Sequence, residues 1–303
     1  MPDPTLPHEA APKTYRYLRV GVVAMAVLLG VSVAIEIAVG SDLGILESIS
    51  AYYYTPVRGV FVGSLLAVAL GLVAIKGREG PEDVMLNLAG MLAPLVAFVP
   101  TPISVTVAGF EVDQRTVPAA LVPAVENNVA ALLVLGLAGL AFAWATVGHG
   151  RTGSAHRRSL AGALVLLGGT AAWFGFARES FLEFGHYAAA VPMFGLIVGV
   201  AVVNARQTTS GAVHHRLARA TYRRAYAAIA VAMGVTIVVA VVFFLLDSTG
   251  HRPFFAWLFW VEVVLLALFA TFWVFQTAEH WNEGLPEFAV RGGPASSVPQ
   301  QSS

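Results

Sequence analysis

The sequence predicts an all-α membrane protein, a bundle of transmembrane helices, and three observations point to this class. Of 303 residues, 57% are hydrophobic and only 12% are charged, against about 25% charged residues in an ordinary soluble domain. The apolar residues come in long runs, and positive charge gathers between alternate runs. Because a soluble core of this size cannot hide so much apolar surface, the composition excludes a water-soluble enzyme.

Eight apolar runs are long enough to cross a hydrocarbon layer, which takes roughly 20 residues of helix. We expect these spans to form a bundle over residues 18–276. We expect residues 1–17 and most of the tail, residues 277–303, to be disordered in the cytoplasm, since both are polar and lack an apolar period. In chain order the predicted spans are 18–40, 57–76, 84–101, 128–148, 159–177, 185–205, 222–246 and 254–276.

The distribution of Lys and Arg predicts the orientation of the chain. With the N-terminus in the cytoplasm, only four of the 18 basic residues lie outside, namely Arg58, Arg115, Arg178 and Arg252. Multi-pass proteins keep positive charge on the cytoplasmic side, so we expect eight spans with both the N- and C-termini cytoplasmic. The cysteine-free chain, rich in Ala, Val and Gly, favours a prokaryotic plasma membrane.

Polar side chains within the spans point to a site, because charged groups in a bilayer are expensive and usually face the bundle interior. Glu36 is predicted roughly 6 Å and Glu262 roughly 12 Å below the outer ends of their spans. His186 opens the sixth span one helical turn after Glu183, so these two share a face. We expect Glu36, His186 and Glu262 to line a water-filled outer pocket that moves a proton or holds a cationic head group. The alternative is that these groups only hydrogen-bond neighbouring helices and fix the packing.

The segment before the second span adds Ser50, three successive tyrosines at 52–54, and Arg58. Because the tyrosine side chains point in different directions, we expect that they are not all core. One interpretation is interfacial anchoring, and the other is a hydroxyl- and Arg-bearing rim that contacts a lipid phosphate. Arg58, one of four external cations, is a candidate partner of Glu47 or Asp113.

The external segment 102–126 is the longest connection between spans. Residues 104–112 alternate in character, which favours either a small β-hairpin or an unstructured loop. The turn sequences after the fourth and sixth spans resemble one another, so a duplicated helical hairpin is one explanation of spans four and five. Shared composition is the other.

Several signatures of catalytic and cofactor sites do not occur in the sequence. The absence of cysteine excludes disulfides, thiol nucleophiles and Cys-ligated metals. The sequence contains no phosphate-binding glycine loop, no nucleophile elbow and no His-Glu-x-x-His zinc motif. A net charge of zero argues against a nucleic-acid partner. We therefore expect no cofactor, no metal and no catalytic residue, with membrane lipids as partners and a homo-oligomer left open.

A set of short motifs resembles a known family. Ile49-Ser50 is followed by Pro56 and Phe61, Asn87-Leu-Ala-Gly90 leads to Pro100, His186-Tyr-Ala opens a later span, and Glu262 precedes Phe272 and Glu279. In this order the motifs resemble the Frag/DRAM/Sfk superfamily of polytopic membrane proteins and its bacterial uncharacterised relatives. The family core is similar to a six-helix unit, so spans four and five would be an insertion or the duplicated hairpin.

The resemblance implies a shared constellation of Ser50, His186 and Glu262 on the outer side, and a role in lipid distribution or membrane trafficking like that of eukaryotic members. Our first hypothesis is a non-enzymatic protein that binds or handles lipid through the outer pocket. The alternative is a proton-coupled small-solute transporter that uses Glu262 and Glu36, with Asn87 and Asn204 aligned beneath Glu262. A second alternative, an intramembrane lipid hydrolase, needs clustered histidines for zinc.

Overall fold

The computed structural model describes residues 6–40, 44–75, 80–103, 117–147, 154–207, 218–251 and 253–281. These residues form α-helices and two short 3-10 turns, η1 (Ser50–Tyr54) and η2 (Ala119–Leu121), with no β-strand among them. The prediction of an all-α fold is therefore confirmed for the described part of the chain. The α-helices are α1 (Leu6–Val39), α2 (Arg58–Ala74), α3 (Pro81–Phe98), α4 (Val122–Val147), α5 (Ser154–Phe176), α6 (Arg178–Gln207), α7 (Arg219–Ser248) and α8 (Trp257–Glu279).

The helices overlap all eight predicted spans, but α1, α4 and α6 begin well before them. Helix α4 begins six residues earlier than predicted and α6 seven, so His186 lies within α6 rather than at its start. Helix α1 begins at Leu6 and thus takes in most of the segment expected to be disordered. Pro7 lies in its first turn, where a missing N–H costs no intrahelical hydrogen bond. The hairpin considered at 104–112 and the tail beyond residue 281 lie outside the described residues.

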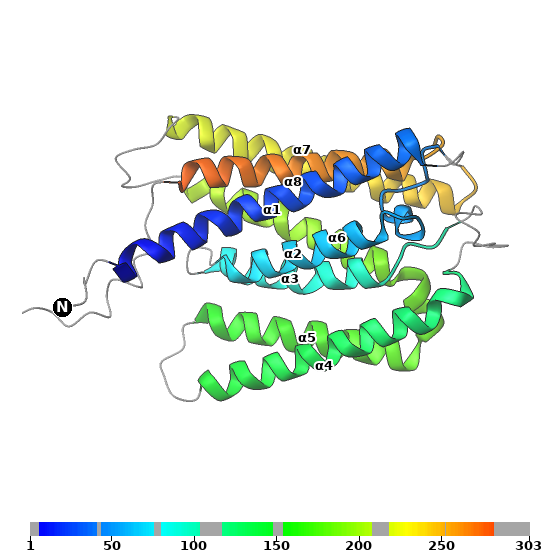
Figure 1. The fold of residues 1–303 in the computed structure, drawn as a ribbon, viewed down its shortest axis with the longest axis horizontal. Helices are drawn as coiled ribbons and strands as arrows, with labels where there is room; N and C mark the ends of the chain where they lie inside the picture. Colours follow the sequence, from blue (N-terminus) through cyan, green and yellow to red (C-terminus); the bar gives the residue numbers. More distant parts are fainter. Residues whose placement is uncertain are drawn as a thin grey trace, which may run out of the picture.

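The helices lie side by side along one common axis (Figure 1). Helix α1 begins and α8 ends at the same end of the bundle, which we call the terminal end. The Arg16 guanidinium lies 5.5 Å from the centre of the Trp281 ring there. The opposite end carries residues 44–57 between α1 and α2, and we call it the loop end.

Six helices in the described part of the chain are long and apolar enough to cross a membrane, namely α1 and α4 to α8. The apolar helix α2 has 17 residues and is shorter, while α3 carries Glu82 and Asp83 in its first turn. Helix α3 packs mostly against α6 and α2, while α2 also has an exposed face, with Leu70 72% accessible. A Cβ at Gly90 of α3 would lie 2.9 Å from the Ala69 carbonyl oxygen of α2, so glycine allows this close approach.

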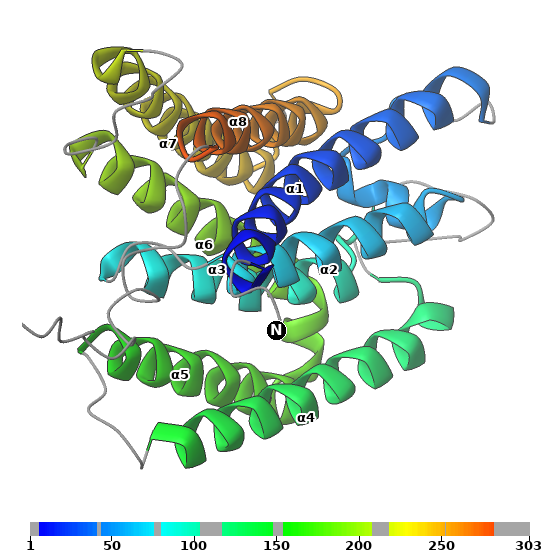
Figure 2. The same ribbon diagram turned by 60° about the vertical axis from the view of Figure 1, so that its left-hand side comes forward.

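Helices α4 and α5 form a hairpin at one edge of the bundle (Figure 2). Their outward side chains are apolar and exposed, with Leu135 69% and Val165 74% accessible. Such a surface is stable against lipid chains and unfavourable in water. The structure therefore describes a multi-pass membrane protein, with α4 and α5 at its periphery.

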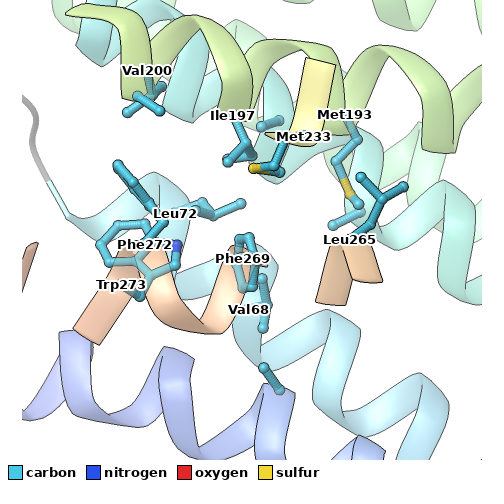
Figure 3. Close-up of a cluster of buried hydrophobic side chains, with 14 of the residues drawn as sticks. Val68, Leu72, Met193, Ile197, Val200, Met233, Leu265, Phe269, Phe272 and Trp273 are labelled. Atoms are coloured by element: carbon cyan, nitrogen blue, oxygen red, sulfur yellow. The ribbon is translucent and has the colours of Figure 1, made fainter. Parts of the chain in front are cut away.

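A belt of packed apolar side chains crosses the middle of the bundle (Figure 3). It joins Val68 and Leu72 of α2 to α6, α7 and α8. Within α8, Leu265, Phe269 and Phe272 are each at least 94% buried. Burying side chains of this size contributes roughly 1.5–3 kcal/mol each relative to exposure to water. The belt separates the polar groups of the loop end from those of the terminal end.

The three tyrosines of η1 are all buried, with 1%, 3% and 2% of their surfaces accessible, so the expectation that they are not all core is wrong. Their side chains do point in different directions, but the turn is enclosed by the loop end of the bundle rather than lying on its surface. The Tyr54 hydroxyl donates to the Thr101 carbonyl at 2.7 Å, and the Tyr52 hydroxyl donates to the Gly44 carbonyl at 3.3 Å. Burial raises the pKa of Tyr54 above its ordinary value, which keeps the hydroxyl a neutral donor.

Candidate functional site

A cavity of about 120 Å³ lies among the loop-end halves of the helices, and we call it the loop-end cavity. It is comparable in size to engineered apolar cavities that bind one small aromatic ring. Four lining residues carry polar side chains: Ser50, His186, Tyr187 and Glu262. The apolar lining comes from α1, η1's flank, α2, α3, α6, α7 and α8 and includes Leu29, Ile49, Phe61, Val96, Val191, Met193, Ile237, Ala240, Val261 and Leu265.

Glu262 of α8 is held by the start of η1, through Ser50 and the backbone of Ile49. The Ser50 N–H donates to Glu262 Oε2 and the Ser50 hydroxyl donates to Glu262 Oε1, both at 3.1 Å. Ser48 adds a second hydroxyl, 3.1 Å from the Ser50 hydroxyl, and accepts the Ala51 N–H at 2.9 Å. Both carboxylate oxygens of Glu262 thus have donors, although the side chain still borders the cavity.

A second contact fixes the same loop to α8 one turn earlier. The Phe259 N–H, one of the helix-start donors without an intrahelical partner, donates to the Glu47 carbonyl at 2.9 Å. Ala256, just before α8, has φ +55° and ψ +30°, a left-handed conformation that costs a non-glycine residue roughly 1–2 kcal/mol. Two hydrogen-bonded positions on α8 therefore determine where Ser50 lies.

His186 of α6 also borders the cavity, and only 2% of its surface is accessible. Its Nδ1 lies 2.7 Å from the Val99 carbonyl at the end of α3. A carbonyl only accepts hydrogen bonds, so Nδ1 carries the proton and Nε2 is the ring nitrogen left for a ligand. Tyr187 shares a 2.8 Å hydrogen bond with the Thr101 hydroxyl.

The structure brings together Ser50, His186 and Glu262 of the predicted site residues but not the other three. Glu36 does not line the cavity, and its carboxyl lies against Gly40, where an added Cβ would be 2.6 Å from it. Glu183 is exposed although it precedes His186 by one turn. Arg58 donates from Nε to the Tyr53 carbonyl at 2.8 Å and covers the Tyr53 ring.

A smaller cavity of about 40 Å³ continues from the first toward the middle of the bundle. The two share the lining residues Leu29, Leu65, Met193, Phe194 and Leu266. Its lining is apolar apart from the Ser64 hydroxyl, which is buried without a hydrogen-bond partner. A water needs two or more polar partners, so this space suits a hydrocarbon group better than water.

A separate set of buried polar side chains lies at the terminal end, and sequence reasoning largely missed it. Glu82 of α3 accepts from Asn204 of α6 at 3.0 Å and from Gln276 of α8 at 3.3 Å. The Tyr226 hydroxyl of α7 donates to Glu279 of α8 at 2.5 Å. We call these five residues the terminal-end network, and each is at least 93% buried.

The sequence contained a weak signal for this network. Asn204 was expected as an inner-side amide, but Glu82 and Glu279 lie near helix ends, where charged residues are ordinarily exposed. Gln276 and Glu279 are three residues apart on α8 and so share one face. Asn87, the other expected amide, donates to Asp83 and to Ser159 of α5, both at 3.3 Å, and lines neither cavity.

Searches of protein-family models, curated proteins and solved structures return no match to this chain. Within the described ranges, no group of three His, Cys, Asp or Glu side chains lies close enough together to hold a metal ion. The chemistry of the site is therefore argued from its own geometry: two acceptors, a carboxylate and an imidazole nitrogen, at the edge of an apolar cavity.

Proposed function

We propose that this chain crosses a prokaryotic plasma membrane eight times, with both termini in the cytoplasm, and binds membrane lipid through the loop-end cavity. The terminal end then faces the cytoplasm and the loop end faces outward. The start of α1 and the end of α8 share one end of the bundle, which supports an even number of crossings. The charge distribution of the sequence supports the orientation.

The observation that carries the lipid assignment is the mixed cavity lining: Ser50, His186, Tyr187 and Glu262 are polar, and the other lining residues are apolar. An amphiphile has this same division between head group and chain. The smaller apolar cavity beyond Met193 and Phe194 extends the space in the direction that a hydrocarbon chain would take. Val191, a lining residue of α6, is 42% accessible on the lipid-facing side of the helix bundle and supports sideways entry.

The transporter alternative has less support, because it needs a polar route from Glu262 to the terminal end. Gln276 lies 14 residues after Glu262 on α8, roughly 21 Å along the helix. The side chains buried between them include Leu265, Phe269 and Phe272. Ser50, His186 and Glu262, the residues implied by the Frag/DRAM/Sfk resemblance, all border the cavity, and we keep membership of that superfamily as part of the proposal.

The lipid assignment is tested by filling the cavity. Ala190 lines it, whereas Ala188 of the same helix is exposed and does not. We expect Ala190→Phe to lose the lipid that co-purifies with the wild-type protein in mild detergent, as measured by native mass spectrometry, while Ala188→Phe retains it. Size-exclusion chromatography and thermal unfolding check that both variants fold. Equal lipid retention by a folded Ala190→Phe variant would refute the assignment.

The orientation is tested separately, because the natural chain has no cysteine and single cysteines can be added. Thr249 at the loop end and Arg219 at the terminal end are both exposed. A membrane-impermeant maleimide should label Thr249→Cys in intact cells and Arg219→Cys only after lysis. Labelling of Arg219→Cys in intact cells would reverse the orientation.

A further inference from the structure

The hydrogen bonds around Glu262 form a chain with one direction. The Ser50 hydroxyl gives its single hydrogen to Glu262 Oε1, so the close contact between the two serine hydroxyls uses the hydrogen of Ser48. Ser48 in turn accepts from the Ala51 N–H. The hydroxyl hydrogens of this chain point toward Glu262, and neither is left to donate to a ligand.

Glu262 and His186 offer acceptors on the cavity lining, while the Tyr187 hydroxyl is hydrogen-bonded with the Thr101 hydroxyl. Each carboxylate oxygen of Glu262 can accept more than one hydrogen bond. His186 donates from Nδ1 to Val99, so its Nε2 is an acceptor in the neutral ring. A head group that fits these atoms must itself bring a hydrogen-bond donor.

Among the residues that the structure describes, the cavity lining contains no Lys or Arg. The nearest external cation in the η1 segment, Arg58, is engaged with the Tyr53 carbonyl and ring, and Arg178 pairs with Glu126. A phosphate or carboxylate head group would be moved out of water beside the Glu262 carboxylate without a compensating positive charge. That cost is large in an apolar site.

We propose that the loop-end cavity selects amphiphiles whose head group is a hydrogen-bond donor, a hydroxyl or a primary amine, and excludes anionic head groups. This inference rests on the proposed lipid-binding function and specifies its ligand class. An alcohol donates to Glu262 or His186, and an ammonium group adds a charge attraction to Glu262. It differs from the expectation of a phosphate-binding rim at Arg58.

The experiment uses three photoreactive probes with the same 16-carbon chain and a diazirine at the same position: an alcohol, a primary amine and a phosphate monoester. The full-length protein is placed in phosphatidylcholine nanodiscs, irradiated with each probe and digested, and labelled peptides are quantified by mass spectrometry. We expect the alcohol and the amine to label cavity-lining peptides of α6 and α8 at least about tenfold more than the phosphate does, since a charge-assisted hydrogen bond contributes about 1.5–3 kcal/mol.

Two variants of Glu262 and one control identify the group responsible. Glu262→Leu removes the acceptor and should lower labelling by both donors about tenfold. Glu262→Gln retains an acceptor oxygen but has no charge. Labelling by the alcohol should therefore be kept, and labelling by the amine should be lost. Glu179→Gln changes an exposed carboxylate of α6 and should leave all three probes unchanged. If Glu262→Leu does not fold, the Glu262→Gln comparison decides.

The outcomes separate this inference from the function on which it rests. Cavity labelling by the phosphate equal to that by the alcohol overturns the head-group selection and leaves lipid binding in place. Labelling of the cavity by none of the probes overturns both. Unchanged donor labelling in a folded Glu262→Leu variant removes Glu262 from the site.

Discussion

The loop-end cavity contains a partly buried glutamate, Glu262, and the terminal-end network a buried one, Glu82. Both accept hydrogen bonds, yet the two surroundings differ. Glu82 accepts from side chains of two other helices, α6 and α8, and no network residue lines either cavity. Glu262 accepts from one loop segment, from Ser50 and the backbone of Ile49, and borders open volume. A carboxylate enclosed by packed donors fixes how helices meet, whereas one that faces a cavity has capacity left for a ligand.

The comparison indicates that the polar group easiest to recognise by depth in a span is not the one that holds the bundle together. The network joins α3, α6, α7 and α8. The Glu262 contact joins α8 to the η1 loop alone. Substitutions in the network should therefore change stability, and substitutions at the cavity should chiefly change binding.

The largest effect should come from Glu82→Leu, which leaves the amide donors of Asn204 and Gln276 without their shared acceptor. Burying two unsatisfied donors costs about 2–4 kcal/mol, reduced where lipid-embedded helices find other partners. We expect a clear loss of thermal stability in detergent, measured by tryptophan fluorescence, and unchanged lipid retention in the molecules that remain folded. Glu82→Gln keeps one acceptor oxygen and should lose less. If Glu82→Leu were as stable as the wild-type protein, the terminal-end network would not be the region that stabilises the bundle.

A smaller effect of opposite sign is expected in the apolar belt between them. The Ser64 hydroxyl is buried without a partner, so Ser64→Ala removes a polar group that has lost its hydration. The variant should be about 1 kcal/mol more stable when its thermal unfolding is measured under the same conditions. Destabilisation instead would mean that the hydroxyl has a partner, and that the belt is less apolar than its packing indicates.

The smallest effect concerns the loop that carries Ser50. Ala256 has a left-handed backbone, and Ala256→Gly relieves it while adding flexibility to the unfolded chain. A net gain of about 0.5 kcal/mol follows from these opposing terms. Ala267→Gly, at an exposed position within α8, should instead lose up to about 1 kcal/mol. A loss at position 256 as large as that at 267 would contradict the strain assigned to the loop junction.

Sequence reasoning recovered part of the cavity and almost none of the network. Glu262 and His186 were found because a charged or imidazole side chain within an apolar run stands out in the sequence, however the helices pack. Glu82 and Glu279 were not found, because near the end of a helix a carboxylate is unremarkable until neighbouring helices are seen to cover it. Glu36 and Glu183 show the converse, since their positions along the chain matched the site while their side chains lie elsewhere.

The sequence by itself predicted an all-α fold and the approximate positions of its apolar helices, because apolarity and helix length are local properties of the chain. It did not give the starts of α1, α4 and α6, which begin earlier than their apolar runs. Only the tertiary structure decided which side chains share a cavity, that three tyrosines are enclosed together, and that five polar residues from four helices meet at the terminal end. The direction in which a side chain faces depends on how its helix is rotated and how it crosses its neighbours. Packing between segments far apart in the chain sets both.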